Sequence, residues 1–223
     1  REYFETFNPY KIDKFTKDLT DLYNSYGYNL VDIKHRVVKN KYDNNIVDLE
    51  FDIDEGKISK INKIYFIGNE NFSHQKLKSL IKSKEKNLLR ILGNKNYKEF
   101  QIKNDRITLL NFYKTNGYKN ININFQSEFI ISKNNFNVYF YINEGQKYNF
   151  RNFDYDFNNL SIIGDQKIQL KEISNNFIDN KIKKNNIYNS DKIQNLEDLI
   201  TEKLYDVGVV FFKIDFLEKV ENN

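Results

Sequence analysis

The sequence has no cysteine and only two histidines, His35 and His74, among its 223 residues. The missing cysteine excludes a disulfide framework, a thiolate zinc site and a cysteine nucleophile. The two histidines fall in different copies of an internal repeat, which disfavours a shared metal site. No run of about 18 apolar residues exists, so we expect no membrane-spanning helix. We therefore expect neither a metal nor another cofactor.

An excess of charge of one sign is also lacking. Lysine and arginine number 35 and aspartate and glutamate 31, which leaves a formal net charge of +4. This balance is a weak argument for a nucleic-acid or anionic-membrane partner. The chain begins with "REYFETFNPY", without methionine or a signal-peptide pattern, so we expect it to be a piece of a longer protein.

A repeat organises the sequence. In each of three copies an aromatic residue precedes a glycine by 20 positions, and apolar residues between the two fall at helical spacing. The pairs are Phe7 and Gly27, Tyr97 and Gly117, and Tyr188 and Gly208. This pattern predicts a helix with one buried stripe in every copy, ending at the glycine.

After the glycine the apolar period changes from 3.6 to 2. "NININFQSEFII" and "FNVYFYI" flank the turn "SKNN", and "LVDIKHRVV" and "IVDLEFDI" flank "KNKYDNN", which predicts two hairpins. A further strand is expected at once after each hairpin, in "KISKINKIYFIGN" and "QKYNFRNFDYDF". The unit is therefore strand, short helix, longer helix, strand, strand. The first copy lacks its opening strand and helix, and the third its closing strand.

A Glu-Gly pair ends both hairpins, as Glu55-Gly56 and Glu144-Gly145. Paired acids can serve general acid-base chemistry. Their repetition at corresponding joints favours another interpretation, in which the glycine supplies a backbone bend and the glutamate is solvated. No nucleophile, base and orienting group can be assembled from the sequence, so an enzyme is the least supported class.

Several motifs in register carry a family resemblance. They are "I.KIYFIGNENF....L..LI", "Y....I.....LL.FY..NGY" and "V.FYINEG", together with "ILGNKNY" between the helices. The chain resembles the POTRA (polypeptide-transport-associated) domains of the outer-membrane barrel assembly factors. The resemblance implies an α+β fold of tandem βααββ domains, each with a three-stranded mixed sheet covered on one face by two helices. It places residues 1–55 at the end of a second domain, 56–145 as the third and 146–223 as most of the fourth.

The resemblance also implies a function. Such domains are periplasmic and bind unfolded outer-membrane β-barrel precursors and accessory lipoproteins such as BamB. Contact with the membrane would come only through a barrel that these residues do not include. A sheet edge with free N–H and C=O groups can accept an extended peptide as an added strand, with little demand on its sequence.

In the family the first hairpin strand lies at the sheet edge, which corresponds here to residues 120–131. The expected binding residues are Asn120, Ile121, Asn122, Ile123, Asn124, Phe125, Gln126, Ser127, Glu128, Phe129, Ile130 and Ile131. Their apolar side chains are expected to pack under the helices, with Ile131 on the same face as Ile123 and Phe129. The lipoprotein contact would involve Phe129 and Ile131.

Two alternatives remain open from the sequence. A translocation or autotransporter-assembly factor with POTRA domains would share the fold, although three consecutive copies favour the barrel assembly factor. A sheet with exposed tyrosine and lysine could also stack single-stranded nucleic acid. Most aromatics here lie on the apolar face of a helix or strand, and "KSKEKNLLR" is the only dense basic run, so no nucleic-acid partner is expected.

Overall fold

The computed structural model describes residues 7–43, 45–86, 95–153, 155–157, 162 and 164–221. The chain divides into two compact units. The first comprises Arg1–Leu110 and Asn122–Asn143, and the second comprises Asn111–Ile121 and Glu144–Asn223. Among the helices of the described residues, none is long and apolar enough to cross a membrane.

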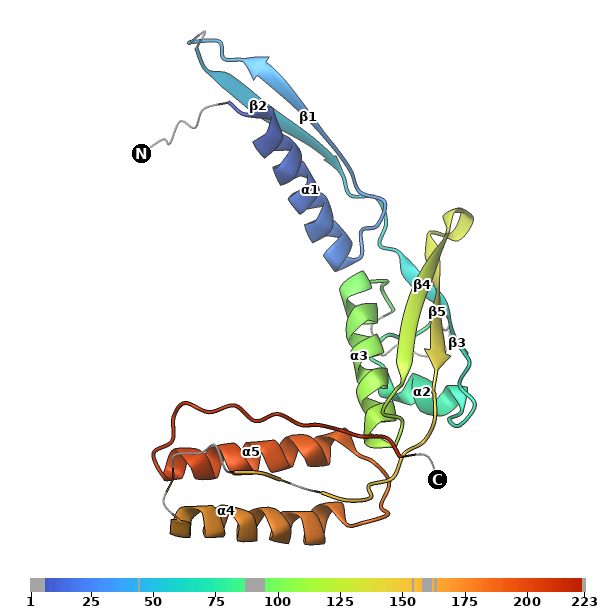
Figure 1. Cartoon of the computed structure of the whole chain (residues 1–223). Coiled ribbons are helices and arrows are strands. Elements are labelled where there is room, and N and C mark those ends of the chain that lie inside the picture. The colour runs from blue at the N-terminus through green and yellow to red at the C-terminus, as the bar shows by residue number, and fades with distance from the viewer. Residues whose placement is uncertain are drawn as a thin grey trace. The chain divides into compact units, whose positions relative to one another are not determined.

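The first unit opens with a helix and a hairpin, drawn in blue in Figure 1. These elements are α1 (Pro9–Tyr26), β1 (Asp32–Lys39) and β2 (Val47–Asp54). The Asn8 side chain caps the helix by accepting the Tyr10 N–H at 3.0 Å. The strands pair antiparallel, and Phe15 of α1 meets Phe51 of β2 edge to face, with ring centroids 5.3 Å apart. The helix and hairpin predicted for the first copy are confirmed, but the predicted buried stripe is not, because Ile12 is buried whereas Phe15, Leu22 and Tyr26 are each more than half exposed.

The middle repeat forms a mixed three-stranded sheet. Its elements are β3 (Lys60–Ile67), α2 (His74–Leu80), α3 (Glu99–Thr115), β4 (Asn122–Ile130), the 3-10 turn η1 (Ile131–Lys133) and β5 (Asn135–Asn143). The strand order is β3-β5-β4. Strand β5 runs parallel to β3 and antiparallel to β4, so the closing strand of the repeat is the centre of its sheet.

The core of the middle repeat lies between one face of the sheet and the two helices (Figure 1). Alternate strand residues are buried there, as period-2 geometry requires. They are Ile61, Ile64, Phe66, Ile123, Val138, Phe140 and Ile142, packed with Leu77, Ile102 and Leu109 from the helices. The predicted α+β arrangement is confirmed in this repeat. Residues 91–94 of "ILGNKNY" lie outside the described residues.

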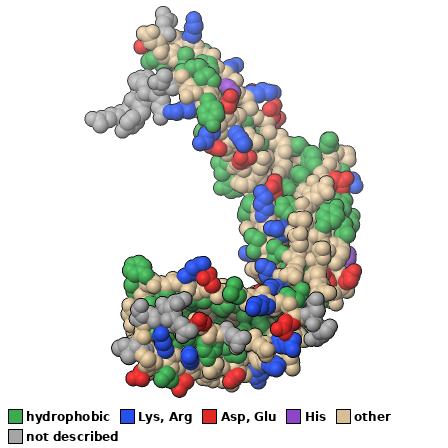
Figure 2. Space-filling view, in the orientation of Figure 1, with side chains coloured by type: hydrophobic (Ala, Val, Ile, Leu, Met, Phe, Trp, Pro, Cys, Tyr) green, Lys and Arg blue, Asp and Glu red, His purple; other side chains and the backbone are tan. Residues whose placement is uncertain are grey.

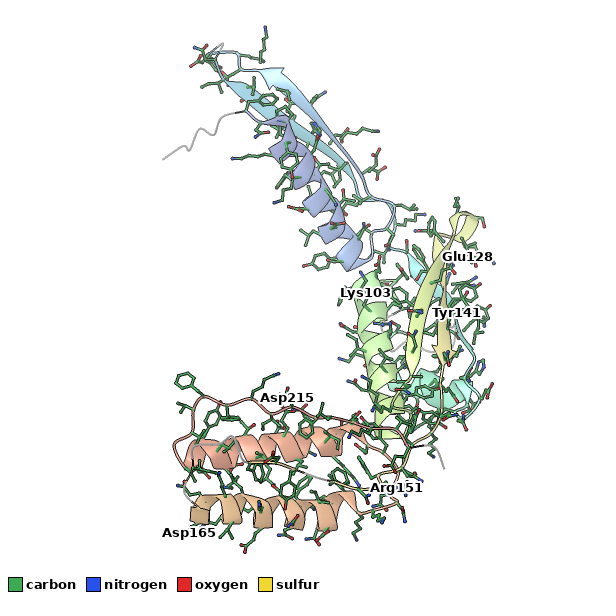
Figure 3. All side chains as sticks on the ribbon, in the orientation of Figure 1. Lys103, Glu128, Tyr141, Arg151, Asp165 and Asp215 are labelled. Carbon is green, nitrogen blue, oxygen red and sulfur yellow. The ribbon has the colours of Figure 1, made fainter. Side chains whose placement is uncertain are left out.

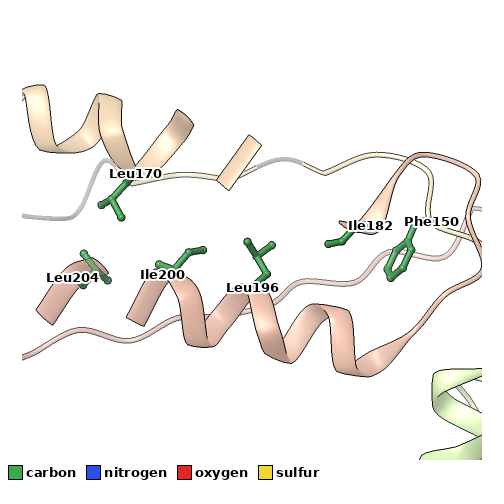
Figure 4. Close-up of a cluster of buried hydrophobic side chains, with 6 residues drawn as sticks. All are labelled: Phe150, Leu170, Ile182, Leu196, Ile200 and Leu204. Carbon is green, nitrogen blue, oxygen red and sulfur yellow. The ribbon is translucent and has the colours of Figure 1, made fainter. Parts of the chain in front are cut away.

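The second unit is built around two helices. They are α4 (Gly164–Phe177), continued by the π-helical turn η2 (Ile178–Ile182), and α5 (Ser190–Asp206). Six buried side chains form the core between them: Phe150, Leu170, Ile182, Leu196, Ile200 and Leu204 (Figure 4). Asn189 caps α5 by accepting the Asp191 N–H at 2.9 Å. The helix predicted before Gly208 is therefore confirmed.

The strands predicted for the third copy do not form among the described residues of the second unit. Residues 146–153 and 209–221 form neither helix nor strand, and the segment after Gly145 makes one isolated bridge, between Asn149 and Ile187. The middle repeat explains the difference, because there β5 supplies the hydrogen-bond partners of both β3 and β4. The third copy has no counterpart of β5 in these 223 residues, so its segments lack the strand that would join them into a sheet.

Candidate strand-binding edge and repeat junctions

Strand β4 lies at one edge of the middle sheet, and among the described strands it pairs with β5 alone. Its bounds differ from the predicted range 120–131 at both ends. Ile121 closes a turn, with its N–H donating to the Tyr118 carbonyl at 3.3 Å, and Ile131 begins η1. The prediction that Ile131 continues the buried face is wrong, because its side chain is 83% exposed at the hairpin tip.

The two faces of β4 differ in polarity. On the helix side Ile123 is buried, and Phe125, Ser127 and Phe129 are half-buried. Phe125 and Phe129 meet Phe140 and Phe136 of β5, with ring centroids 6.5 and 4.8 Å apart. Ile123 is thus buried on the predicted face, whereas Phe125 and Phe129 are half-buried there and contact aromatic rings of β5.

The opposite face of β4 is open and polar. Asn122, Asn124, Gln126 and Glu128 are exposed there. Glu128 accepts a hydrogen bond from the Tyr139 hydroxyl of β5 at 2.9 Å, and Figure 3 labels Glu128 on β4. One strand thus carries an aromatic row beside the helices and an amide-rich row on the open face.

The other edge of the sheet, along β3, is occupied by the chain itself. The Ile61 N–H donates to the Lys95 carbonyl at 2.8 Å, and the Ile61 carbonyl accepts the Lys86 N–H at 2.7 Å. Further along, the Ile64 N–H donates to the Glu85 carboxylate at 2.8 Å. Backbone groups engaged in this way cannot pair with an added strand. The two edges are therefore not equivalent.

Among the described residues, one side chain forms a hydrogen bond with the outward backbone of β4. The Arg106 Nε of α3 donates to the Ile123 carbonyl. That carbonyl points away from β5, and because backbone direction alternates along a strand, Phe125, Ser127 and Phe129 direct their N–H and C=O groups outward too. Sequence reasoning missed Arg106. The available signal was a basic residue within the helical stripe of Ile102 and Leu109.

The recurring aromatics and glycines of neighbouring copies meet at two junctions. In the first unit the Ser59 N–H donates to the Gly27 carbonyl, and the Ser59 carbonyl accepts the Tyr97 N–H, both at 2.9 Å. In the second unit Tyr148 does the same between Gly117 and Tyr188, again at 2.9 Å for both bonds. The recurring spacing of these aromatics and glycines therefore reflects a pair of backbone hydrogen bonds, called a relay below, that joins one copy to the next.

The Glu-Gly pairs lie beside these relays. Gly56 and Gly145 have φ of +62° and +64°, in the left-handed region that favours glycine, which agrees with the predicted backbone bend. The prediction that both glutamates are solvated is wrong for one of them. Glu55 is exposed, whereas Glu144 is only 6% exposed.

A tyrosine donates to each glutamate. The Tyr23 hydroxyl reaches Glu55 at 3.1 Å, and the Tyr113 hydroxyl reaches Glu144 at 2.9 Å. The hydrogen bond to Glu55 raises the pKa of Tyr23. Burial, and then the hydrogen bond to Glu144, raises the pKa of Tyr113 much further. Both tyrosines are neutral donors at physiological pH, and the contacts they make are structural.

A family model described as "POTRA: Surface antigen variable number repeat" matches residues 3–56, 59–145 and 155–223. The chain belongs to the POTRA family. Two curated relatives that this chain matches are named outer membrane protein assembly factor BamA. The one from Buchnera aphidicola subsp. Acyrthosiphon pisum (strain APS) is 32% identical over 212 residues, which is 94% of this chain and 32% of the relative.

The second relative, from Neorickettsia risticii (strain Illinois), is 33% identical over 113 residues, covering 49% of this chain and 15% of the relative. This chain thus spans about a third of the length of the first relative and less of the second. A crystal structure of Haemophilus influenzae BamA POTRA3-5 aligns with all of this chain and 76% of its own, at 19% identity and a TM-score of 0.48.

Proposed function

We propose that this chain is a periplasmic, non-catalytic binding module of the outer-membrane β-barrel assembly machinery, which receives unfolded barrel precursors by strand addition at β4. The named relatives support the cellular role, since both are outer membrane protein assembly factors. The observation that supports the mode of binding is the difference between the two sheet edges. Strand β3 is engaged at Ile61 and Ile64 by Lys95, Lys86 and Glu85, whereas among the described residues no hydrogen bond reaches the outward groups of β4 beyond Ile123.

Strand addition suits clients that vary in sequence. Main-chain hydrogen bonds supply the affinity, and they form with any extended peptide. The ordering of an unfolded client opposes association, so each encounter with a single edge is weak. Weak and sequence-tolerant capture is the property that a module serving many barrel precursors needs.

The same proposal covers the domain organisation and a second partner. Residues 1–55, 56–145 and 146–223 would correspond to the end of the second, the third and most of the fourth POTRA domain of an assembly factor. An accessory lipoprotein such as BamB would dock near Phe129 and Ile131. The 83% exposure of Ile131 beside the open edge supports this location, because an exposed aliphatic side chain gives a partner apolar area to bury.

The test is an NMR titration of the labelled chain with a peptide from the last strand of an outer-membrane barrel protein. We expect the outward amides of Phe125, Ser127 and Phe129 to shift most, while the amides of β3 serve as an internal control. The variant Ser127→Pro removes one outward N–H and leaves the pairing of β4 with β5 intact, so it should weaken the shifts.

A single-stranded oligonucleotide of similar length is titrated in parallel. Basic and acidic side chains are interspersed on the face in Figure 2, so no strong electrostatic attraction is expected. Shifts with the oligonucleotide alone, centred on lysine and tyrosine side chains, would replace the proposal with nucleic-acid binding. Shifts of β3 in place of β4 would disprove the assigned edge.

A further inference from the structure

We propose that the β4 edge selects strands in which apolar and polar residues alternate. It accepts them in one side-chain phase, that is, with their apolar side chains on the helix side of the sheet, and Arg106 sets the residue of β4 at which pairing begins. This inference rests on the proposed strand addition and concerns which strand is accepted and how it is placed. It follows from three features of the edge: its two faces, a small residue between two aromatic rings, and the engaged carbonyl of Ile123.

The two faces of β4 impose the phase. An added strand would place alternate side chains beside Phe125, Ser127 and Phe129, and the others beside Asn124, Gln126 and Glu128. Directly opposite side chains on neighbouring strands interact at close range. A slip by one residue would move every apolar side chain of the client from the aromatic row to the amide row. The edge therefore distinguishes the two phases.

Ser127 shapes the aromatic row. Its side chain is small and stands between Phe125 and Phe129, whose rings lean on β5 behind them. An apolar client side chain opposite Ser127 would be flanked by both rings and would remove apolar surface of all three side chains from water. Strands of outer-membrane barrels alternate apolar and polar residues, so they carry the pattern that this edge favours.

Arg106 limits the paired segment. Its Nε occupies the carbonyl of Ile123, the first outward carbonyl of the helix-side row within β4. An added strand would begin to pair at Phe125 unless it displaced the guanidinium. A longer client strand would gain one more pairing position only in a chain that lacks the Arg106 side chain.

The absence of cysteine makes the phase directly measurable, because single-cysteine variants report one position each. Gln126→Cys places a thiol on the amide row, and the adjacent Ser127→Cys places it on the aromatic row. The probes are two synthetic peptides alternating valine or phenylalanine with threonine or lysine, one with its cysteine in the apolar row and one in the polar row. Disulfide formation is followed under mild oxidation, normalised to the reaction of each variant with a small disulfide reagent.

We expect Ser127→Cys to couple to the apolar-row peptide, and Gln126→Cys to the polar-row peptide, each with a preference of roughly tenfold, which corresponds to two or three favourable cross-strand pairs. Equal or reversed coupling in the four combinations would overturn the phase and leave strand addition standing. No coupling, together with an absence of amide shifts in the titration, would overturn both.

Arg106→Ala tests the limit of the segment, with Lys103→Ala as the matched control on the exposed side of the same helix. Lys103 pairs with Glu99 at 2.7 Å, and Figure 3 labels it on α3. In Arg106→Ala the amide shifts caused by a long alternating peptide should extend to Ile123 and Asn124, and they should stop at Phe125 in Lys103→Ala. An unchanged shift boundary in Arg106→Ala would show that the guanidinium sets no limit.

Discussion

The two repeat junctions use the same residue types at corresponding positions but bury them differently. In the first, the Tyr23 hydroxyl meets an exposed Glu55; in the second, the Tyr113 hydroxyl meets a buried Glu144. Each donor is also packed edge to face on another tyrosine, with ring centroids 5.8 Å apart for Tyr23 and 5.5 Å for Tyr113. The local motif thus fixes the contact but not its burial.

The difference lies in what surrounds each relay. Two residues after the glycine, the first junction has Asn29, whose amide donates to the carbonyls of Gly27 and Tyr97 at 3.0 and 3.3 Å. The second has Lys119, which pairs with Glu218 at 2.5 Å. The amide of Asn29 thus bonds to Gly27 and Tyr97, which belong to the junction itself, whereas Lys119 pairs with an acid outside the repeated junction residues, about a hundred residues away in the sequence. The second junction therefore depends more on distant residues.

Removing the tyrosine hydroxyl should give the largest difference between the junctions. In Tyr113→Phe a buried carboxylate loses a donor, and hydrogen bonds to charged groups contribute about 1.5–3 kcal/mol. We expect a loss of free energy of unfolding in this range, measured by urea unfolding followed by circular dichroism. Tyr23→Phe is the matched control, and it should change stability little because its partner Glu55 is in water.

Equal losses in the two variants would contradict the comparison, since they would mean that burial of Glu144 adds nothing to the bond. The slope of the unfolding transition should stay constant for the comparison to hold, because a changed slope indicates loss of two-state behaviour. Local hydrogen exchange at the amides of Gly145 and Tyr148 would then replace the global measurement.

A second, smaller difference concerns the recurring tyrosines. Tyr97 stacks on Phe136 with centroids 3.7 Å apart, whereas the Tyr188 hydroxyl donates to Glu218 at 3.1 Å. Burial, together with the charge of Glu218, raises the pKa of Tyr188 to about 12. Since an unfolded tyrosine ionises near pH 10, Tyr188 keeps its proton to a higher pH in the folded state. The stability contributed by Tyr188 is complete below about pH 10 and is lost as the pH rises toward 12.

Unfolding of the wild type and of Tyr188→Phe between about pH 9 and pH 12 measures this loss. The stability difference between them should be about 1 kcal/mol at the lower pH and should shrink as the pH rises. Glu218→Gln retains Tyr188 but removes the charge that raises its pKa in the folded state, so its pH-dependent loss should still begin near pH 10 but should be smaller and end at lower pH. A difference that is constant with pH would show that the Tyr188 proton is not linked to folding.

The junctions also show what the sequence could predict. The recurrence of Tyr97 and Tyr188 with Gly27 and Gly117 was visible, because helix ends and turns impose local residue requirements at fixed spacing. The sequence did not predict the hydrogen bonds between these residues and the next copy, because the same spacing is also explained by the start and end of a helix within one copy. The burial of Glu144 was missed for the same reason, because burial is decided by residues outside the motif.

The sheet of the middle repeat was also predicted in part. The alternation in residues 122–130 predicted β4, and the family resemblance predicted its position at the edge. The contacts of Glu85 with β3 and of Arg106 with β4 could not be predicted, because a side chain that reaches from one element to the backbone of another leaves no periodic pattern in the sequence. In the third copy the periodic pattern was insufficient, because a strand needs a partner and the central one is missing.

The smallest expected effect comes from exchanging the residue that distinguishes the junctions. Lys119→Asn gives the second junction the amide of the first and removes the ion pair with Glu218, whose side chain is 34% exposed. We expect a loss of at most about 1 kcal/mol in low salt, and a smaller loss at high ionic strength, where the ion pair is screened. Urea unfolding at two salt concentrations measures both. A loss that does not shrink with salt would mean that the aliphatic stem of Lys119 packs against the junction, so that its volume rather than its charge separates the two junctions.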